Sequence, residues 1–189
     1  LTWSLGLAAD IPGVSDRAGT DEGALVRSQL VSGSGVIPTT STGRLFDAAA
    51  ALLGVRHTVT YEAQAAMELE ALARRCAHDH TAELLGLVDL HGLIERLITG
   101  LREQLPTACL ARFFHVGLTR LLVQALNSVQ APPATIGLTG GVLANRLLAG
   151  GLTLGLTAAG YRVVSHQVVP ANDGGLALGQ ALAGTLREG

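Results

Sequence analysis

The apolar positions in the first two thirds of the chain repeat at helical spacing. This three-and-four periodicity predicts a helix over about 42–53, a second helix after Gln64 and a third over 89–101. Between the first two helices, the run Val55–Thr60 is rich in β-forming residues. This part of the chain is therefore predicted to be mainly helical, with one β-prone segment.

The longest predicted helix begins at Thr107, after Pro106. Its apolar stripe predicts a core helix. The stripe comprises Leu110, Phe113, Phe114, Leu118, Leu121, Leu122, Ala125, Leu126 and Val129. His115 lies at the edge of the stripe, and we expect it to be a packing or hydrogen-bonded histidine.

The pattern changes after Pro132-Pro133. A short buried strand is predicted from Thr135, followed by a glycine turn and a helix over roughly Val142–Ala159. The β-forming residues of Tyr161–Val169 predict a second strand, and a last helix covers Leu176–Leu186. The end of the chain is therefore predicted to be α/β.

The composition is that of a folded domain. Hydrophobic residues make up 48% of the chain and charged residues 15%, which excludes a disordered protein. The mean hydropathy is +0.40. Glycine, arginine or polar residues nevertheless interrupt every apolar run, so no membrane span is predicted. Aromatic residues are 3% and the net charge is −2, so neither stacking platforms nor a basic surface for nucleic acid is expected.

The two cysteines bear on the cellular compartment. Cys76 and Cys109 are far apart in the chain and form no CxxC pair. This spacing predicts buried thiols in a reducing compartment, hence a cytoplasmic protein, and neither a disulfide nor a zinc site. The chain starts at Leu1 without an initiator methionine or a signal peptide, and we expect a fragment or processed piece of a longer protein.

The first candidate for chemistry is the Gly140-Gly141 turn. Two glycines between a strand and a helix let backbone N–H groups approach a ligand without a Cβ in the way, and the helix N-terminus behind them favours phosphate. Asn145, expected in the first turn of that helix, offers a donor and an acceptor to the same ligand. The alternative is an ordinary helix start that happens to use two glycines.

A second glycine-rich loop, Ala171–Gly175, joins the second predicted strand to the last helix. Asp173 lies just before that helix, where an N-cap is the common role of an aspartate. The functional interpretation is a carboxylate at the C-terminal end of a strand, available to a hard cation. The two loops together predict a nucleotide cleft lined by helix N-termini.

Other candidates carry less weight. Asp47 lies off the apolar face of its predicted helix, so it faces either water or a cleft, and solvated surface is the common case. His78 and His80 are two residues apart, which on a helix gives them different faces, and we favour a surface or structural role over metal binding. The chain has no serine elbow, catalytic cysteine–histidine signature or P-loop, so no catalytic residue is predicted.

Four motifs, in this order, resemble the HypF carbamoyltransferases of hydrogenase maturation, in their C-terminal Kae1-like domain. The motifs are Thr42–Gly54, Tyr61–Glu70, Thr139–Val142 with Asn145-Arg146, and Val169–Gly175 with Leu178–Ala181. The resemblance covers about Val26 to the end. A weaker resemblance extends to the tRNA threonylcarbamoyl transferases of the Kae1/TsaD type.

The resemblance implies a helix-rich α/β fold, the C-terminal lobe of an actin-like (ASKHA, ribonuclease H-like) ATPase domain with added helices. Residues 1–189 would form a single fragment, the second half of a Kae1-like domain. Within it, residues 36–130 would be the mainly helical region and 131–189 the α/β nucleotide-binding part. Acylphosphatase-like, zinc-finger and YrdC-like parts of the same chain would lie upstream.

The implied activity is carbamoyl transfer. The full-length enzyme would use ATP and carbamoyl phosphate to form carbamoyl-adenylate in its YrdC-like domain. The Kae1-like domain would then pass the carbamoyl group to the C-terminal cysteine of a HypE-like partner, where it becomes a precursor of the cyanide ligand of the NiFe hydrogenase centre. The fragment alone would be incomplete and inactive.

The resemblance also implies roles for individual residues. Asp47 would bind a ribose hydroxyl, Gly140-Gly141 would lie against the nucleotide with Asn145 as a polar contact, and Asp173 would be a ligand of a divalent metal ion. The family's His-x-x-x-His metal pair does not occur in this chain, so the other ligands would lie upstream and the site in this chain would be weak. Ala63 stands where the family commonly has glycine.

Two other functions remain open at this stage. The chain could be a non-catalytic module that docks a HypE-like partner, or a protein of the tRNA threonylcarbamoyl transferase type. The near-neutral charge and scarce aromatic residues argue against direct RNA contact in the latter case.

Overall fold

The computed structural model describes residues 20–77, 86–87 and 89–187. The chain divides into two compact units, with the boundary between Phe114 and His115, inside helix α6. Helices dominate the described residues, and two short parallel strands lie in the second unit. The prediction of a helix-rich α/β chain is therefore confirmed.

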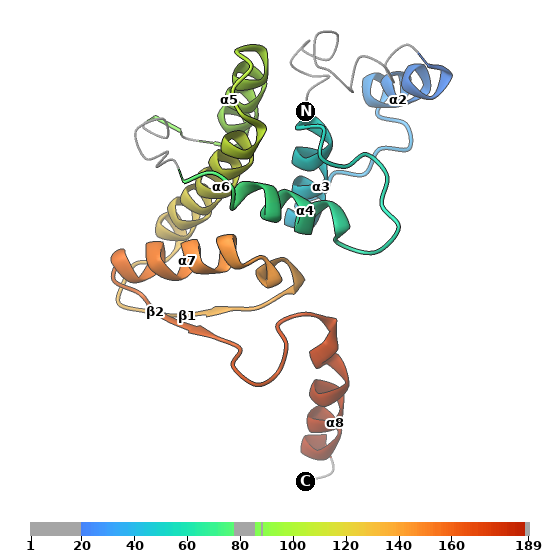
Figure 1. Cartoon of the computed structure of the whole chain (residues 1–189). Coiled ribbons are helices and arrows are strands. Elements are labelled where there is room, and N and C mark those ends of the chain that lie inside the picture. Colours follow the sequence, from blue (N-terminus) through green and yellow to red (C-terminus); the bar gives the residue numbers. More distant parts are fainter. Residues whose placement is uncertain (1–19, 78–85, 88, 188–189) are drawn as a thin grey trace. The chain divides into compact units, whose positions relative to one another are not determined.

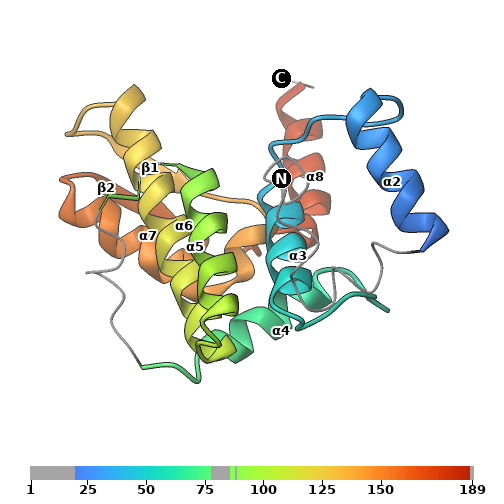
Figure 2. The ribbon, with the colours of Figure 1, turned by 90° about the horizontal axis from the view of Figure 1, so that it is seen from above.

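The first unit is helical, as predicted. Its elements are α2 (Asp21–Ser32), α3 (Thr42–Leu52), α4 (Gln64–Ala73), α5 (Leu90–Arg102) and the first part of α6 (Thr107–Val129). α3 packs against α4, and α5 runs beside α6 (Figure 2). The side chain of Ser41 caps α3, and that of Asp89 caps α5.

The core of the first unit is built around two aromatic rings. Phe46 of α3 and Phe114 of α6 meet edge to face, with ring centroids 5.2 Å apart and an interplanar angle of 89°. Leu69, Leu93 and Leu97 are fully buried with them in the core. The predicted apolar faces of α3, α4 and α5 are thus the faces that the structure buries.

The β-prone run Val55–Thr60 forms no strand in the structure, so that indication is wrong. A side-chain network holds the segment instead. Arg56 binds Glu68 through two hydrogen bonds of 2.8 and 2.6 Å. Gln64, which is buried, accepts the Thr60 backbone N–H at 2.8 Å and donates to Glu68 at 3.0 Å. These side chains satisfy the loop without a partner strand.

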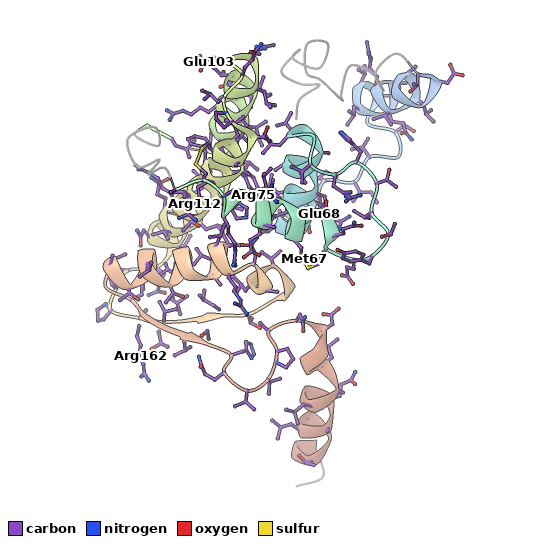
Figure 3. All side chains as sticks on the ribbon, viewed as in Figure 1. Met67, Glu68, Arg75, Glu103, Arg112 and Arg162 are labelled. Carbon is purple, nitrogen blue, oxygen red and sulfur yellow. A yellow bond between two sulfur atoms is a disulfide. The ribbon has the colours of Figure 1, made fainter. Side chains whose placement is uncertain are left out.

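The network also explains the electrostatics of this loop. The Arg56 guanidinium, and then the Gln64 amide, hold the pKa of the Glu68 carboxyl below its ordinary value. Glu68, on α4, is labelled in Figure 3. The pair therefore stays ionised to a lower pH than an isolated glutamate would, and its contribution to stability is lost only as the pH falls through that lowered pKa.

Ala63, the residue that departs from the resembled family, adopts a left-handed conformation with φ 61°. A Cβ makes this region costly, whereas glycine adopts it freely. We expect Ala63→Gly to raise the free energy of unfolding by about 1 kcal/mol. Ala71→Gly, within α4, should lower it by about 1 kcal/mol. Urea unfolding of both variants checks this, and a loss in both would contradict it.

Cys76 and Cys109 form a disulfide, with Cα atoms 5.1 Å apart (Figure 3). The prediction of two free thiols is wrong, because separation along the chain does not measure separation in space. Cys76 follows α4 and Cys109 lies in the first turn of α6, and these helix ends are adjacent. The inference of a reducing compartment loses its support from these residues.

The second unit is α/β. After the C-terminal part of α6 come β1 (Thr135–Leu138), η2 (Gly141–Ala144), α7 (Arg146–Ala158), β2 (Arg162–Ser165), η3 (Asp173–Gly175) and α8 (Leu176–Arg187). β1 and β2 pair in parallel, with Thr135 opposite Arg162 and Leu138 opposite Ser165. α7 connects the two strands and lies along one face of the pair (Figure 1).

Three predictions about this unit need correction. β1 is not a buried strand, because Ile136 and Leu138 are only half-buried and the residues between and before them are exposed. β2 ends at Ser165, and Val168, expected within it, is 95% exposed. The C-terminal half of the α6 stripe, from Leu121 onward, is half-buried or exposed, and Val129 at its end is 80% exposed. A pair of two short strands covers less apolar surface than a full sheet.

α6 is long and apolar enough to cross a membrane by length and composition alone, which the prediction of no span did not anticipate. The core helix of a globular domain passes the same test. In the structure, 39% of the apolar stretch of α6 that passes this test is buried. Leu110, Phe114 and Leu118 are among the buried side chains.

Candidate functional site

A cavity of about 630 Å³ lies in the second unit, at the carboxyl ends of β1 and β2. η2, one face of α7 and the segment that follows β2 form its walls. Its polar lining residues are Arg146, Thr153, Ser165, His166, Gln167 and Asn172. Ligands of parallel α/β sheets bind outside the carboxyl ends of the strands, and the volume suits a small molecule.

The two predicted glycine loops lie against each other beside this cavity. The Gly140 N–H donates a hydrogen bond of 2.9 Å to the carbonyl oxygen of Ala171. A Cβ on Gly141 would lie 3.8 Å from the Cβ of Asn172. Gly140 has φ 108°, a conformation that L-residues rarely adopt, and both glycines are exposed. The turn therefore presents accessible backbone, as a ligand-binding loop requires.

Asn145 is the N-cap of α7. The expectation that it lies within the first turn of the helix is therefore wrong by one position. The short helix η2 intervenes between the glycines and α7. Oδ1 of Asn145 accepts the Leu148 N–H at 3.0 Å, and Nδ2 lies 3.0 Å from Nε2 of His115. His115 is 1% exposed and Asn145 8%. The prediction of a hydrogen-bonded His115 is confirmed.

Asp173 is the first residue of η3 and is exposed. The N-cap role considered for it belongs to Asn172, whose side chain accepts the Gly174 N–H at 3.1 Å. The Asp173 carboxylate thus stands at a helix start beside Asn172, which lines the cavity. Its role as a metal ligand stays a prediction.

The described part of the chain does not assemble a metal site from its own side chains. Among residues 20–77, 86–87 and 89–187, no group of three or more histidine, cysteine or acidic side chains could hold a metal ion. His78 and His80 lie outside the described residues. The single exposed carboxylate of Asp173 fits one position of a cation's shell, with phosphate oxygens, water and other protein segments as the remaining ligands.

Asp47 belongs to the first unit, whereas the other four predicted residues belong to the second. It lies on α3, with its side chain 31% exposed, and forms an ion pair of 2.8 Å with Arg44 one turn earlier. Asp47 is therefore neither a core residue nor fully solvated, in agreement with its position off the apolar face.

The sequence did not single out two residues that line the cavity, Arg146 and His166. Nε2 of His166 lies 2.9 Å from Oγ1 of Thr139, so a side-chain contact joins the segments that follow the two strands. The sequence predicts a strand that continues to Val169 and so places His166 inside it. In the structure β2 ends at Ser165, and His166 is the first residue after the strand. Arg146 belongs to one of the four family motifs, although the motif by itself implies no role for it.

These features define an α/β subdomain with a ligand cavity at its strand ends. Comparison of the chain with known protein families identifies its family. Residues 4–180 match the family model described as "Carbamoyltransferase, Kae1-like Domain, second subdomain". The chain belongs to this family, the HypF carbamoyltransferases. The resemblance identified from the sequence motifs is thereby confirmed.

Curated relatives agree over most of the chain. The "Carbamoyltransferase HypF" of Rhizobium leguminosarum bv. viciae is 39% identical over 188 residues, which cover 94% of this chain and 24% of the relative. The "Probable carbamoyltransferase HypF" of Methanocaldococcus jannaschii is 31% identical over 156 residues, 80% of this chain and 20% of the relative. The chain thus spans between a fifth and a quarter of the length of these relatives.

Solved structures show the same fold. A full-length HypF in a phosphate- and nucleotide-bound form aligns with a TM-score of 0.75 and 28% identity, over 92% of this chain and 24% of that protein. The HypF of T. kodakarensis aligns with a TM-score of 0.70 and 25% identity, over 94% of this chain and 24% of that protein.

Proposed function

We propose that this chain is the nucleotide-binding second half of the Kae1-like domain of an ATP-dependent carbamoyltransferase. The complete enzyme uses ATP and carbamoyl phosphate to form carbamoyl-adenylate, and transfers the carbamoyl group to the C-terminal cysteine of a HypE-like protein in NiFe hydrogenase maturation. It acts in the cytoplasm together with upstream domains of its own chain, and the complete Kae1-like domain has the actin-like ATPase fold.

One observation carries the proposal: the Gly140–Ala171 hydrogen bond brings the two glycine loops together beside a cavity at the carboxyl ends of two parallel strands. Exposed backbone without side chains suits a phosphate, and Arg146 adds a cationic side chain to the cavity wall. A full-length HypF of the same fold is known in a nucleotide-bound form.

The chemistry needs a site that binds a nucleotide and stabilises its phosphate. In the proposed transfer, the partner's thiolate attacks the carbonyl carbon of the carbamoyl group. The carbon–oxygen bond to the adenylate phosphate breaks, and AMP leaves with the electron pair. The negative charge of AMP is stabilised by the backbone N–H of Gly141 and by Arg146. A divalent cation bound by Asp173 would supply further charge neutralisation.

Calorimetric titration tests the nucleotide site. A non-hydrolysable ATP analogue should bind the complete gene product. Binding should be lost in Gly141→Val, which places an isopropyl group on the loop, while Ala71→Ser, on a helix of the other unit, should bind as the wild type does. Absence of binding by the folded wild type, combined with retention of a HypE-like protein in a pull-down, would favour a non-catalytic docking module instead.

A further inference from the structure

We infer that His115 is a positioning residue for the nucleotide site: as a neutral imidazole with an unprotonated Nε2, it fixes the amide of Asn145 and with it the start of α7, next to the Gly140-Gly141 turn. The contribution of this pair to nucleotide binding rests on the proposed function. The pairing itself rests on the geometry alone.

The hydrogen bonds of Asn145 determine the orientation of its amide. The Leu148 N–H, 3.0 Å away, requires an acceptor, so the oxygen Oδ1 must face the helix start. The nitrogen Nδ2 then faces His115 at 3.0 Å. An amide nitrogen only donates, so Nε2 of His115 must accept, and a neutral ring then carries its proton on Nδ1. The structure thereby specifies one tautomer.

Burial makes this arrangement costly to break. His115 is 1% exposed and Asn145 8% exposed, so water cannot readily replace either partner. A buried polar group that loses its partner costs more than the hydrogen bond itself contributes. Loss of the imidazole would leave Nδ2 of Asn145 without this acceptor and release the amide to rotate away from its capping orientation.

The pair connects the nucleotide loop to the rest of the unit. Asn145 ends η2, and its backbone N–H donates to the Val142 carbonyl at 3.1 Å, directly after the glycines. His115 belongs to α6, whose Thr119 hydroxyl donates to the His115 carbonyl at 2.8 Å. The position of the Gly140-Gly141 turn is therefore tied to α6 through one side-chain contact.

The test uses the complete gene product, the non-hydrolysable ATP analogue, three single variants and one double variant. His115→Leu removes the acceptor, and we expect about tenfold weaker nucleotide binding. His115→Gln offers an oxygen in a similar place and should restore affinity to within about threefold of the wild type. Asn145→Ser keeps a capping oxygen for Leu148 but has no NH₂ for His115. In that background, His115→Leu should have little further effect, because the contact is already absent.

A spectroscopic readout separates this inference from the proposed function. The long-range proton–nitrogen NMR spectrum of the imidazole should show a protonated Nδ1 and an unprotonated Nε2. If the wild type binds no nucleotide, the proposed function fails, while this signal still decides the pairing. Nucleotide binding with unchanged affinity in a folded His115→Leu variant, or a proton on Nε2 at neutral pH, would overturn the inference. If His115→Leu does not fold, the affinity of Asn145→Ser and the tautomer signal decide it.

Discussion

The complete enzyme carrying Asp173→Ala should lose about 10²-fold in the rate of carbamoyl transfer to the C-terminal cysteine of a HypE-like protein. Asp173 is the only acidic side chain of the two glycine loops. It is exposed at the start of η3, beside the cavity residue Asn172. An exposed carboxylate of this kind contributes little to stability, so its removal should act on the charge balance at the phosphate and not on the fold.

The measurement is mass-spectrometric detection of the carbamoylated cysteine over time, with carbamoyl phosphate and ATP in excess. Glu103→Ala, an exposed carboxylate of the first unit, is the matched control and should retain the wild-type rate. Asp173→Glu should recover part of the activity if the side chain is a cation ligand. Wild-type transfer by Asp173→Ala would remove the role assigned to this residue.

The local patterns predicted the elements, because helix periodicity and capping are properties of neighbouring residues. The boundaries of α3 and the start of α6 followed from apolar spacing together with the flanking cap, glycine and proline residues. The expectation of a packing or hydrogen-bonded His115 also agrees with the structure. The four motifs were sufficient to indicate the family without knowledge of the tertiary contacts. The placement of Gly140-Gly141 at a strand end was also predictable, since Thr135 opens a β-prone run that the glycines interrupt.

What the sequence could not give were contacts between distant residues. Cys76 and Cys109 are 33 positions apart but form a disulfide, because the ends of two helices meet. The β-prone run after α3 forms no strand, because Arg56 and Thr60 are bound by side chains of α4. In the second case tertiary contacts override a local preference.

The glycines of α7 show the same limit and give the second large expected effect. By helix propensity alone, Gly150 and Gly151 would each weaken the helix by a similar amount. In the structure, a Cβ on Gly151 would lie 2.9 Å from Oγ1 and 3.0 Å from Cγ2 of Thr119 on α6. A Cβ on Gly155 would lie 3.0 Å from Cγ2 of Val123, one turn further along both helices. A Cβ on Gly150 would meet nothing within 4 Å.

Adjacent glycines should therefore respond in opposite directions. Gly150→Ala should raise the free energy of unfolding by about 1 kcal/mol through helix propensity. Gly151→Ala should lower it by about 1 kcal/mol and Gly151→Leu by about 3 kcal/mol. The facing side chains of α6, Thr119 and Val123, are β-branched, so in a helix they are confined to few rotamers and cannot move aside. The Thr119 hydroxyl is also held by its 2.8 Å bond to the His115 carbonyl.

Urea unfolding followed by circular dichroism, together with amide hydrogen exchange in α7, measures these effects in the second unit. A gain in stability for both alanine variants would show that α6 and α7 do not approach at Gly151. Because His115 and Asn145 join the same two helices, Gly151→Leu should also accelerate exchange of the Leu148 amide. The close approach that glycine permits between α6 and α7 would then be the reason why Asn145 reaches the buried imidazole and holds the Gly140-Gly141 turn.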